Sequence, residues 1–468
     1  MKLSAKQQHQ LRVEMRRALT VSLPLIGAQL LHVGNAVIDT MIAGRIGRVE
    51  LAAGGVGAAI FTIVLLAGIG LMGSLSPTMA RAIGRSQRSE VGYIFRQGLW
   101  LAALIGIAAF LVLTLVIHTL PHWGLAPELI PQMQSYLQAV RWGMPPALVF
   151  LAARNVCEAT GGGRAVLIVQ AIGLVVNLLG NLALGLGWFG FPALGLTGIG
   201  WTTAIVMLSM AAIILWLLTG RHFVSYKLYA RFDQPDLQEL KRLLRLSSTI
   251  AMTLLFEAGL FTATAIQMGK LGAIPASAHN IAIGVAALFY MLPLGLGMTL
   301  TARVSVAVGR NSRSSLHLRV WSGIGITLLM ALASATALIL FREQIPWLYT
   351  SDAAVHALTA QLLLMAAVFQ ISDDFQVTLI SMLRGMHDTR VPMLINAFSY
   401  WVIAFGIGYY ATHYLGFGAH GLWFALIVGL TISAALLSWR LRWKLANAQK
   451  LMQPVATVKP VSTPPVLE

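Results

Sequence analysis

The sequence predicts an all-α integral membrane protein with twelve transmembrane helices in two pseudo-symmetric six-helix lobes. Hydrophobic residues make up 57% of the 468 residues and charged residues only 10%, and the mean hydropathy is +0.76. Soluble globular domains carry about 25% charged residues, so this composition excludes a water-soluble domain. The apolar residues also fall into separate stretches, each long enough for the roughly 20 residues that cross a bilayer as a helix.

Charged residues or clusters rich in Pro and Gly separate these stretches. They cover residues 17–42, 52–78, 93–119, 132–158, 165–187, 194–218, 243–268, 277–303, 318–341, 355–383, 391–413 and 418–440. A polar arm, 1–16, precedes the first stretch, which lacks an A-x-A cleavage site and is expected to be an uncleaved signal anchor. The last segment, 445–468, is rich in proline, and we expect it to be a disordered cytoplasmic tail.

Positive charges collect on one side of the predicted spans. Nearly all Lys and Arg residues fall in the arm, in alternate loops, in the linker 219–242 and after the last span. Basic residues stay on the cytoplasmic side during insertion, so we expect a multi-pass protein of the cell inner membrane with both termini in the cytoplasm. A basic inner face accounts for the net charge of +17 without nucleic acid, and no obligate protein partner is predicted.

The chain contains an internal repeat. Residues 23–85 superimpose on 248–310 without a gap, which places Gly70 on Gly295 and Gly84 on Gly309. This repeat divides the chain into an N-lobe (17–218), the cytoplasmic linker 219–242 and a C-lobe (243–444). Because each half has an even number of spans, the repeats are parallel, and transporters of this kind bind substrates and ions near the membrane midplane.

Acidic residues inside the C-lobe spans are functional candidates, because a charge in hydrocarbon is costly. Glu257 on the seventh span and Asp373 on the tenth are expected at a similar depth near the midplane. The pair could share a hard cation such as Na⁺, which oxygen ligands suit. Alternatively, desolvation and mutual repulsion would make the pair a proton carrier. Asp374, which directly follows Asp373, is an auxiliary candidate.

A second polar cluster is expected in the N-lobe. His32, Asn35 and Asp39 form one stripe on the first span. Asn177 and Asn181, four residues apart on the fifth span, suit interhelical hydrogen bonding as well as ion or proton chemistry.

Other motifs have structural interpretations. Glu158 follows Arg154 by four residues, which favours a local ion pair. The G-x-G-x-x-G of Gly68–Gly73 lies in a long apolar span and follows no strand, so it indicates helix packing and not a dinucleotide site. The sequence has no phosphate-binding G-x-x-x-x-G-K-[ST] motif and no triad of catalytic residues. We therefore expect neither an enzyme nor a cofactor, and the energy source is an ion gradient.

The sequence resembles the multidrug and toxic compound extrusion (MATE) family, and specifically its NorM branch, over roughly residues 15–440. The resemblance rests on Pro24-Leu-Ile with Gln29, Val37–Gly44, Arg154–Glu158, Phe256-Glu257 with Phe261, Tyr290–Gly295, Gln370–Asp373, Leu383–Gly385 and Asp388–Arg390. It implies a V-shaped pair of lobes that export organic cations and other drugs in exchange for Na⁺ or H⁺. It also implies a C-lobe cation site at Glu257 and Asp373, and an N-lobe acid at Asp39 beside Asn177 and Asn181.

The candidates for the drug cavity are Phe261, Phe369, Gln29 and Asn35. Phe261 and Phe369 could add cation–π contacts to an organic cation. A lipid-linked saccharide flippase of the same wider superfamily is the alternative function. Such a protein is expected to line its cavity with several Arg residues, whereas Arg141 is the only Lys or Arg away from the ends of a predicted span.

Overall fold

The computed structural model describes residues 5–123, 127–349 and 352–447. These residues contain helices and connecting turns but no strand. The N-lobe comprises α1 (Ala5–Ile46), α2 (Arg48–Met72), α3 (Leu75–Gly84), α4 (Arg88–Thr119), α5 (Leu129–Val140), α6 (Met144–Thr160), α7 (Gly163–Gly180) and α8 (Leu196–Leu217). The C-lobe comprises α9 (Leu237–Lys270), α10 (Ala273–Gly309), α11 (Arg313–Phe341), α12 (Ala353–Gly385), α13 (Arg390–Ala397), α14 (Phe405–His413) and α15 (Gly418–Ala446).

Eleven of the predicted spans correspond to helices, or runs of helices, that are long and apolar enough to cross a membrane within the described residues. The exception is 132–158, which is broken into α5 and α6 by a 3₁₀ turn at Arg141–Gly143. The break has a chemical cause, because Pro145 and Pro146 lie in the first turn of α6. A proline there lacks only an N–H that would have no partner in a new helix, whereas inside a continuous helix it would remove a hydrogen bond.

Two further spans contain a π-helical segment. The π-helix Asn181–Gly185 continues α7, and the π-helix Phe398–Ala404 joins α13 to α14. The segments therefore occupy the fifth predicted span of one lobe and the fifth of the other. π-helical turns are rare and often mark functional positions.

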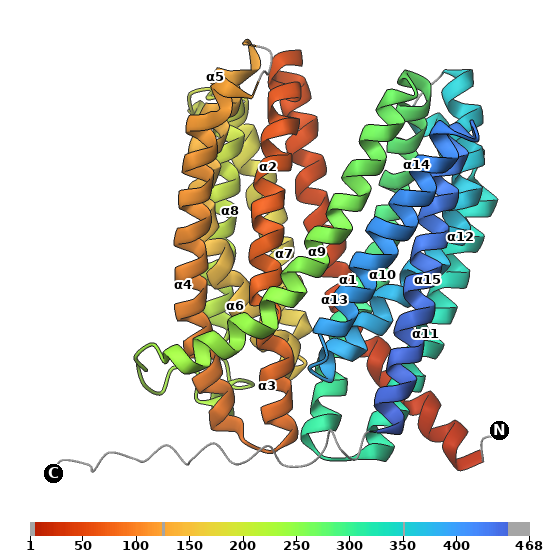
Figure 1. Cartoon of the computed structure of the whole chain (residues 1–468). Helices are drawn as coiled ribbons and strands as arrows, with labels where there is room; N and C mark the ends of the chain where they lie inside the picture. The colour runs from red at the N-terminus through yellow and green to blue at the C-terminus, as the bar shows by residue number, and fades with distance from the viewer. Residues whose placement is uncertain (1–4, 124–126, 350–351, 448–468) are drawn as a thin grey trace.

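The two lobes diverge toward the end of the molecule that is uppermost in Figure 1 and pack together in its lower half. α1 and α9 cross between them. The lower part of α1 packs on α10 and α11 of the C-lobe, and α9 packs on α2 of the N-lobe. Accordingly Ala18 of α1 belongs to a core cluster of the C-lobe, while Leu240 and Leu243 of α9 belong to the main N-lobe cluster.

Glycines of the internal repeat form the contact between the lobes. A Cβ atom on Gly295 of α10 would lie 2.8 Å from the Cα atom of Ile26 in α1, and a Cβ on the equivalent Gly70 of α2 would lie even closer to the Cα atom of Ala251 in α9. Gly84 and Gly309 pack directly on each other, because a Cβ on either would lie 2.9 Å from the Cα of the other. Only glycine permits backbones to approach this closely, so the repeat encodes the interface as well as the lobes.

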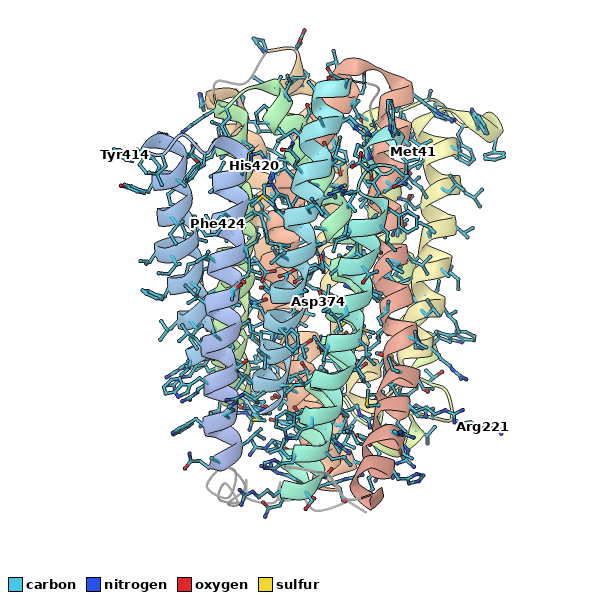
Figure 2. All side chains as sticks on the ribbon, turned by 90° about the vertical axis from the view of Figure 1, so that its right-hand side faces the viewer. Met41, Arg221, Asp374, Tyr414, His420 and Phe424 are labelled. Carbon is cyan, nitrogen blue, oxygen red and sulfur yellow. The ribbon has the colours of Figure 1, made fainter. Side chains whose placement is uncertain are left out.

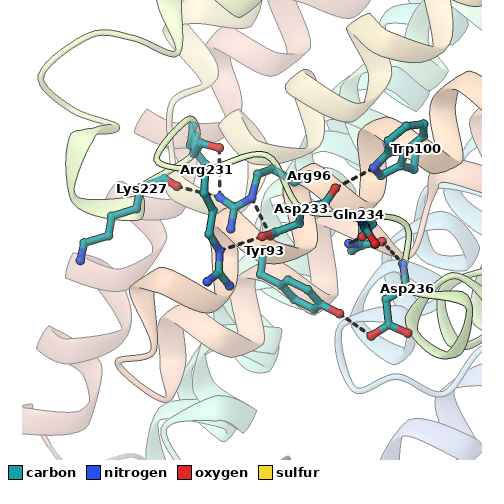
Figure 3. A network of polar contacts seen from close by, with 10 residues as sticks. Tyr93, Arg96, Trp100, Lys227, Arg231, Asp233, Gln234 and Asp236 are labelled. Atoms are coloured by element: carbon teal, nitrogen blue, oxygen red, sulfur yellow. Dashed lines mark hydrogen bonds and ion pairs between the residues drawn. The ribbon is translucent and has the colours of Figure 1, made fainter. Parts of the chain in front are cut away.

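The segment between the lobes is attached to the N-lobe. It runs from the end of α8 to Asp236, because α9 begins at Leu237, before the predicted end of the linker. Figure 3 shows how α4 holds it: Arg96 forms an ion pair with Asp233 (2.7 Å), and the Tyr93 hydroxyl donates to Asp236 (2.7 Å).

Both described ends of the chain lie at the lower end in Figure 1. The predicted arm 1–16 is helical from Ala5 onward, and α15 continues to Ala446, beyond the predicted end of the last span. Of the predicted disordered tail 445–468, residues 448–468 lie outside the described residues.

Candidate cation site and its N-lobe counterpart

Helices α9, α10 and α12 bring the predicted C-lobe acids to one polar centre. Tyr290 of α10 donates its hydroxyl hydrogen bond to Glu257 Oε1 at 3.1 Å. Asp373 is 3% exposed, its Oδ1 atom is buried without a partner, and it lies close enough to Glu257 and Tyr290 for electrostatic interaction. The structure therefore brings Glu257 and Asp373 together, as the sequence predicts.

The π-helix of the C-lobe adds Tyr400 to this centre. Tyr400 is 1% exposed and lies within electrostatic range of Glu257, Asp373 and Tyr290. Asn396 donates to the Tyr400 hydroxyl at 3.4 Å, and Ser433 of α15 donates to Asn396 at 2.8 Å. Six elements, α9, α10, α12, α13, the π-helix and α15, thus contribute polar side chains to one largely buried network.

Oxygen atoms dominate this centre, which suits a hard monovalent cation or a proton. In the described part of the chain, no three His, Cys, Asp or Glu side chains are placed so that together they could hold a metal ion. A transition-metal site therefore has no support there, and a Na⁺ ion would take further ligands from hydroxyl groups, backbone carbonyls or water. The phenol of Tyr290 fits this chemistry, because it already contacts one carboxylate.

The N-lobe holds its acid in a different way. Asp39 Oδ1 accepts hydrogen bonds from Asn177 (2.9 Å) and from Asn181 (2.6 Å), which begins the π-helix. Asn181 is fully buried and its Oδ1 atom has no hydrogen-bond partner. Asp39, Asn177 and Asn181 of the predicted N-lobe cluster therefore come together, with two amide groups donating to one carboxyl oxygen, whereas no hydrogen bond joins His32 or Asn35 to them in the described residues.

The predicted cavity residues occupy different environments. Phe369 is 2% exposed in the C-lobe core, where its ring makes an edge contact with the ring of the half-buried Phe261 at 6.1 Å. Asn35 of α1 is half-buried, and its Oδ1 atom has no partner. Gln29 is buried at the contact between the lobes, where it accepts a hydrogen bond from Arg154 at 2.8 Å.

The predicted ion pair of Arg154 and Glu158 forms at 2.9 Å. Arg154 also donates to the sulfur of Met298 in α10 at 3.0 Å, so it connects the N-lobe to the C-lobe. Sequence reasoning missed this bridge, because nothing in the spacing of Arg154 indicates a partner in the other lobe.

Tyr290 and Tyr400 were also missed as site residues. A tyrosine in an apolar span is common and carries no signal of depth or of orientation. Tyr290 lies 33 residues from Glu257 along the chain, and Tyr400 owes its position to a π-helical segment that the apolar periodicity does not reveal. The internal repeat offers a partial signal, because the fifth span of the N-lobe already contained polar candidates.

Comparison with known proteins supports both lobes. The model of the MatE family matches residues 24–183 and 249–410. "Probable multidrug resistance protein NorM" of Xanthomonas axonopodis pv. citri (strain 306) is 37% identical over 433 residues, which are 92% of this chain and 94% of that protein. "Multidrug resistance protein MdtK" of Yersinia pestis (strain Pestoides F) is 34% identical over 437 residues, with 92% and 96% covered.

Solved structures share the fold. The crystal structure of the eukaryotic MATE transporter AtDTX14 superimposes with a TM-score of 0.84 at 16% identity, covering 95% of this chain and all of that one. A structure described as the outward-facing conformation of a multidrug resistance MATE family transporter gives 0.85 at 19% identity, covering 96% of this chain and 100% of the other. Because the family model matches both lobes and the relatives align along nearly the whole chain, this protein belongs to the MatE family of transporters.

Proposed function

We propose that this protein exports organic cations and other lipophilic drugs in exchange for Na⁺ or H⁺ entering the cell. Relatives that are 37% and 34% identical over 92% of the chain are named multidrug resistance proteins. The observation that carries the proposal is the centre formed by half-buried Glu257 and Tyr290 with buried Asp373, in which one oxygen of Asp373 has no partner. Such a centre is costly to build inside a membrane unless a cation or a proton occupies it.

The chemistry of the centre accounts for exchange. A cation or proton at Glu257 and Asp373 neutralises the charge that would otherwise attract a cationic drug. The coupling ion and the drug therefore compete for the same negative charge. The Tyr290 hydroxyl, which donates to Glu257 at 3.1 Å, offers its oxygen to a cation or its hydrogen to the free carboxylate. Coupling then requires that the ion and the drug bind with different affinities in the two conformations.

The membrane orientation is part of the proposal. Both described chain ends, and the loops that carry most of the Arg residues, lie at the closed end of the molecule. Basic loops stay on the cytoplasmic side, so the lobes diverge toward the outside and the structure is an outward-open state of an inner-membrane protein.

Cysteine labelling tests this orientation, because Cys157 is the chain's single cysteine and is fully buried. Gln87, between α3 and α4, and Gln344, after the end of α11, are both exposed, and these two connections lie at opposite ends of the molecule in Figure 1. In intact cells, an impermeant maleimide is expected to label Gln344→Cys and to spare Gln87→Cys. The reverse pattern would overturn the orientation.

Transport is tested in proteoliposomes by measuring ethidium movement under a Na⁺ gradient and, separately, under a H⁺ gradient. At least one gradient is expected to drive transport, and Glu257→Gln is expected to reduce the driven rate at least tenfold. Glu343→Gln is the matched control, because Glu343 is 61% exposed and follows the end of α11, outside the predicted spans. Full gradient-driven transport by the Glu257→Gln variant would contradict the assignment of the site, and no response of the wild type to either gradient would contradict the antiport.

A further inference from the structure

α12 carries a second buried acid that the proposed exchange does not use. Asp374 is fully buried and lies at about mid-height of the molecule in Figure 2. It follows Asp373 directly, and consecutive helical residues point about 100° apart, so the two acids face different neighbours. Asp374 shares its stripe of α12 with Gln370 and Thr378, each one turn away.

This stripe faces α11. Thr378 shares a 2.9 Å hydrogen bond with Thr327 of α11, which fixes the register of the two helices. Ser334, two turns further along α11, is buried without a partner for its hydroxyl. Asp374 therefore belongs to a polar seam between α11 and α12, away from the network of Glu257, Tyr290 and Tyr400.

The two oxygens of Asp374 have unequal partners. Oδ1 accepts a 2.6 Å hydrogen bond from Nε2 of Gln370, whereas Oδ2 is buried without a partner. The Oε1 atom of Gln370, the other half of the same amide, is also buried without a partner. Two neighbouring acceptor atoms on the two hydrogen-bonded groups thus both lack a donor.

No basic side chain faces Asp374 from the helices around it. The sequence of α11 is uncharged between Arg319 and Arg342, that of α10 between His279 and Arg303, and that of α15 between His420 and Arg440. Asp373, the preceding residue of α12, lies within electrostatic range of Asp374 and is itself an acid. An ionised Asp374 would therefore be an unpaired charge beside another acid, which is costly in a membrane interior.

A single proton would give both Asp374 Oδ2 and Gln370 Oε1 the hydrogen bond that each lacks. Placed on Asp374 Oδ2, it makes this atom a donor that Gln370 Oε1 can accept, while Gln370 Nε2 continues to donate to Oδ1. The carboxylic acid and the amide then form a closed ring of two hydrogen bonds. A Na⁺ ion at the same place would need several more oxygen ligands, and the hydroxyls of Thr327 and Thr378 are already bonded to each other.

We propose that Asp374 and Gln370 form a proton-binding site of the C-lobe that is separate from the site at Glu257 and Asp373. When the site fills, a hydronium ion gives up this proton: one of its O–H bonds breaks, an O–H bond forms on Asp374 Oδ2, and a water molecule remains. This inference deepens the proposed exchange, on which its relevance to transport rests. A proton at Asp374 removes one negative charge beside Asp373, so the ion at the first site meets two carboxylates and not three.

Infrared spectroscopy of the reconstituted full-length protein tests the proposal, because a protonated carboxyl group has its own C=O absorption. At pH 7.5 the wild type is expected to show this absorption, and Asp374→Asn is expected to lose the intensity of one group. Asparagine can keep both hydrogen bonds to Gln370, so this variant is expected to fold. The matched control is Asp388→Asn, because buried Asp388 forms ion pairs with Arg440 (2.8 Å) and Lys444 (3.2 Å) and has no need of a proton.

A second variant guards against misfolding of the first. Gln370→Leu removes the acceptor of the proton, so the remaining absorption is expected to shift to the higher frequency of a free acid. An unchanged spectrum in Asp374→Asn would overturn the proposal. So would loss of the Asp374 absorption when Na⁺ is added to the wild type, since that result assigns the site to a metal ion. Ethidium transport in the same liposomes reports on the proposed exchange separately, because transport can fail while the absorption persists.

Discussion

Asn181 of the N-lobe shows how a single residue can hold the carboxyl group of an acid, here Asp39, by a hydrogen bond. It supplies the shorter of the two amide hydrogen bonds to Asp39, at 2.6 Å against 2.9 Å for Asn177. Hydrogen bonds to a charged group contribute about 1.5–3 kcal/mol. Asn181→Ala is expected to lower the unfolding free energy by that order, measured as a lower thermal unfolding midpoint in detergent. Asn447→Ala, at the end of α15, is the control and is expected to leave the midpoint unchanged.

At this scale the sequence predicts acids better than their partners. Glu257, Asp373 and Asp39 stand out because a carboxylate in an apolar span is rare and costly. Tyr290 and Tyr400 complete the same centre but are ordinary residues for such a span. Their roles depend on which face of each helix turns inward, and apolar periodicity is weak in helices that meet lipid on one side and protein on the other.

The start of α9 is the element-scale feature with a clear electrostatic basis. Asp236 caps the helix by accepting from the backbone N–H groups of Gln238 (2.9 Å) and Glu239 (3.3 Å), and it accepts a further bond from Tyr93 of α4. These hydrogen bonds, above all the one from Tyr93, lower the pKa of Asp236. The cap therefore also attaches the linker between the lobes to α4.

The lowered pKa sets the direction of a pH effect. A carboxyl group with a lower pKa in the folded state stabilises the fold above its unfolded pKa of about 3.9, and this contribution is lost as the pH falls through the folded pKa. The thermal midpoint of Asp236→Asn is thus expected to fall less steeply than that of the wild type below about pH 4. Tyr93→Phe removes the main cause of the lowered pKa, so its thermal midpoint is expected to depend on pH less steeply than that of the wild type. Parallel curves of midpoint against pH for the wild type, Asp236→Asn and Tyr93→Phe would contradict the role of the charge. Asp236→Ala also removes the cap, which typically costs about 1 kcal/mol.

Helix boundaries show where prediction of elements reached its limit. The apolar stretch 132–158 was predicted as one membrane span, yet Pro145 and Pro146 divide it into α5 and α6, and neither is among the described helices that are long and apolar enough to cross a membrane. The π-helices at Asn181–Gly185 and Phe398–Ala404 cannot be recognised in this way, because the extra residue of a π-helical turn is not of a characteristic type as proline is. Long spans are predictable from hydropathy. Helix breaks and π-helical turns, which set the direction of the side chains in the sites, are not.

At the scale of the whole molecule, α1 ties the N-terminal segment to the C-lobe. Glu14 forms ion pairs with Arg303 of α10 and, at 3.6 Å, with Arg319 of α11. Removing one partner of a largely buried ion pair leaves the other charge uncompensated. Glu14→Gln is expected to destabilise this conformation more than Glu50→Gln, a change at the first turn of α2 outside any ion pair in the described residues. Protection of α10 and α11 from hydrogen exchange is the measurement, and equal protection in the two variants would contradict the role of Glu14.

Gly84 and Gly309 offer the sharpest test of how the lobes move. They occupy equivalent positions of the repeat, and a methyl group on either would lie 2.9 Å from the Cα atom of the other as well as against backbone carbonyls. Overpacking of this kind costs roughly 1–3 kcal/mol, and only in conformations that keep the lower ends of the lobes together. Gly84→Ala and Gly309→Ala are therefore expected to shift the population away from the present conformation by about 5- to 150-fold.

Gly55→Ala and Gly284→Ala are the matched controls, because a Cβ at either position has nothing within 4 Å. Distances between spin labels at positions 87 and 313 are expected to lengthen in the first pair of variants and to stay as in the wild type in the controls. If all four variants gave the wild-type distances, the contact between the lobes would not be one that opens during the cycle, and the rocking motion would have to pivot elsewhere.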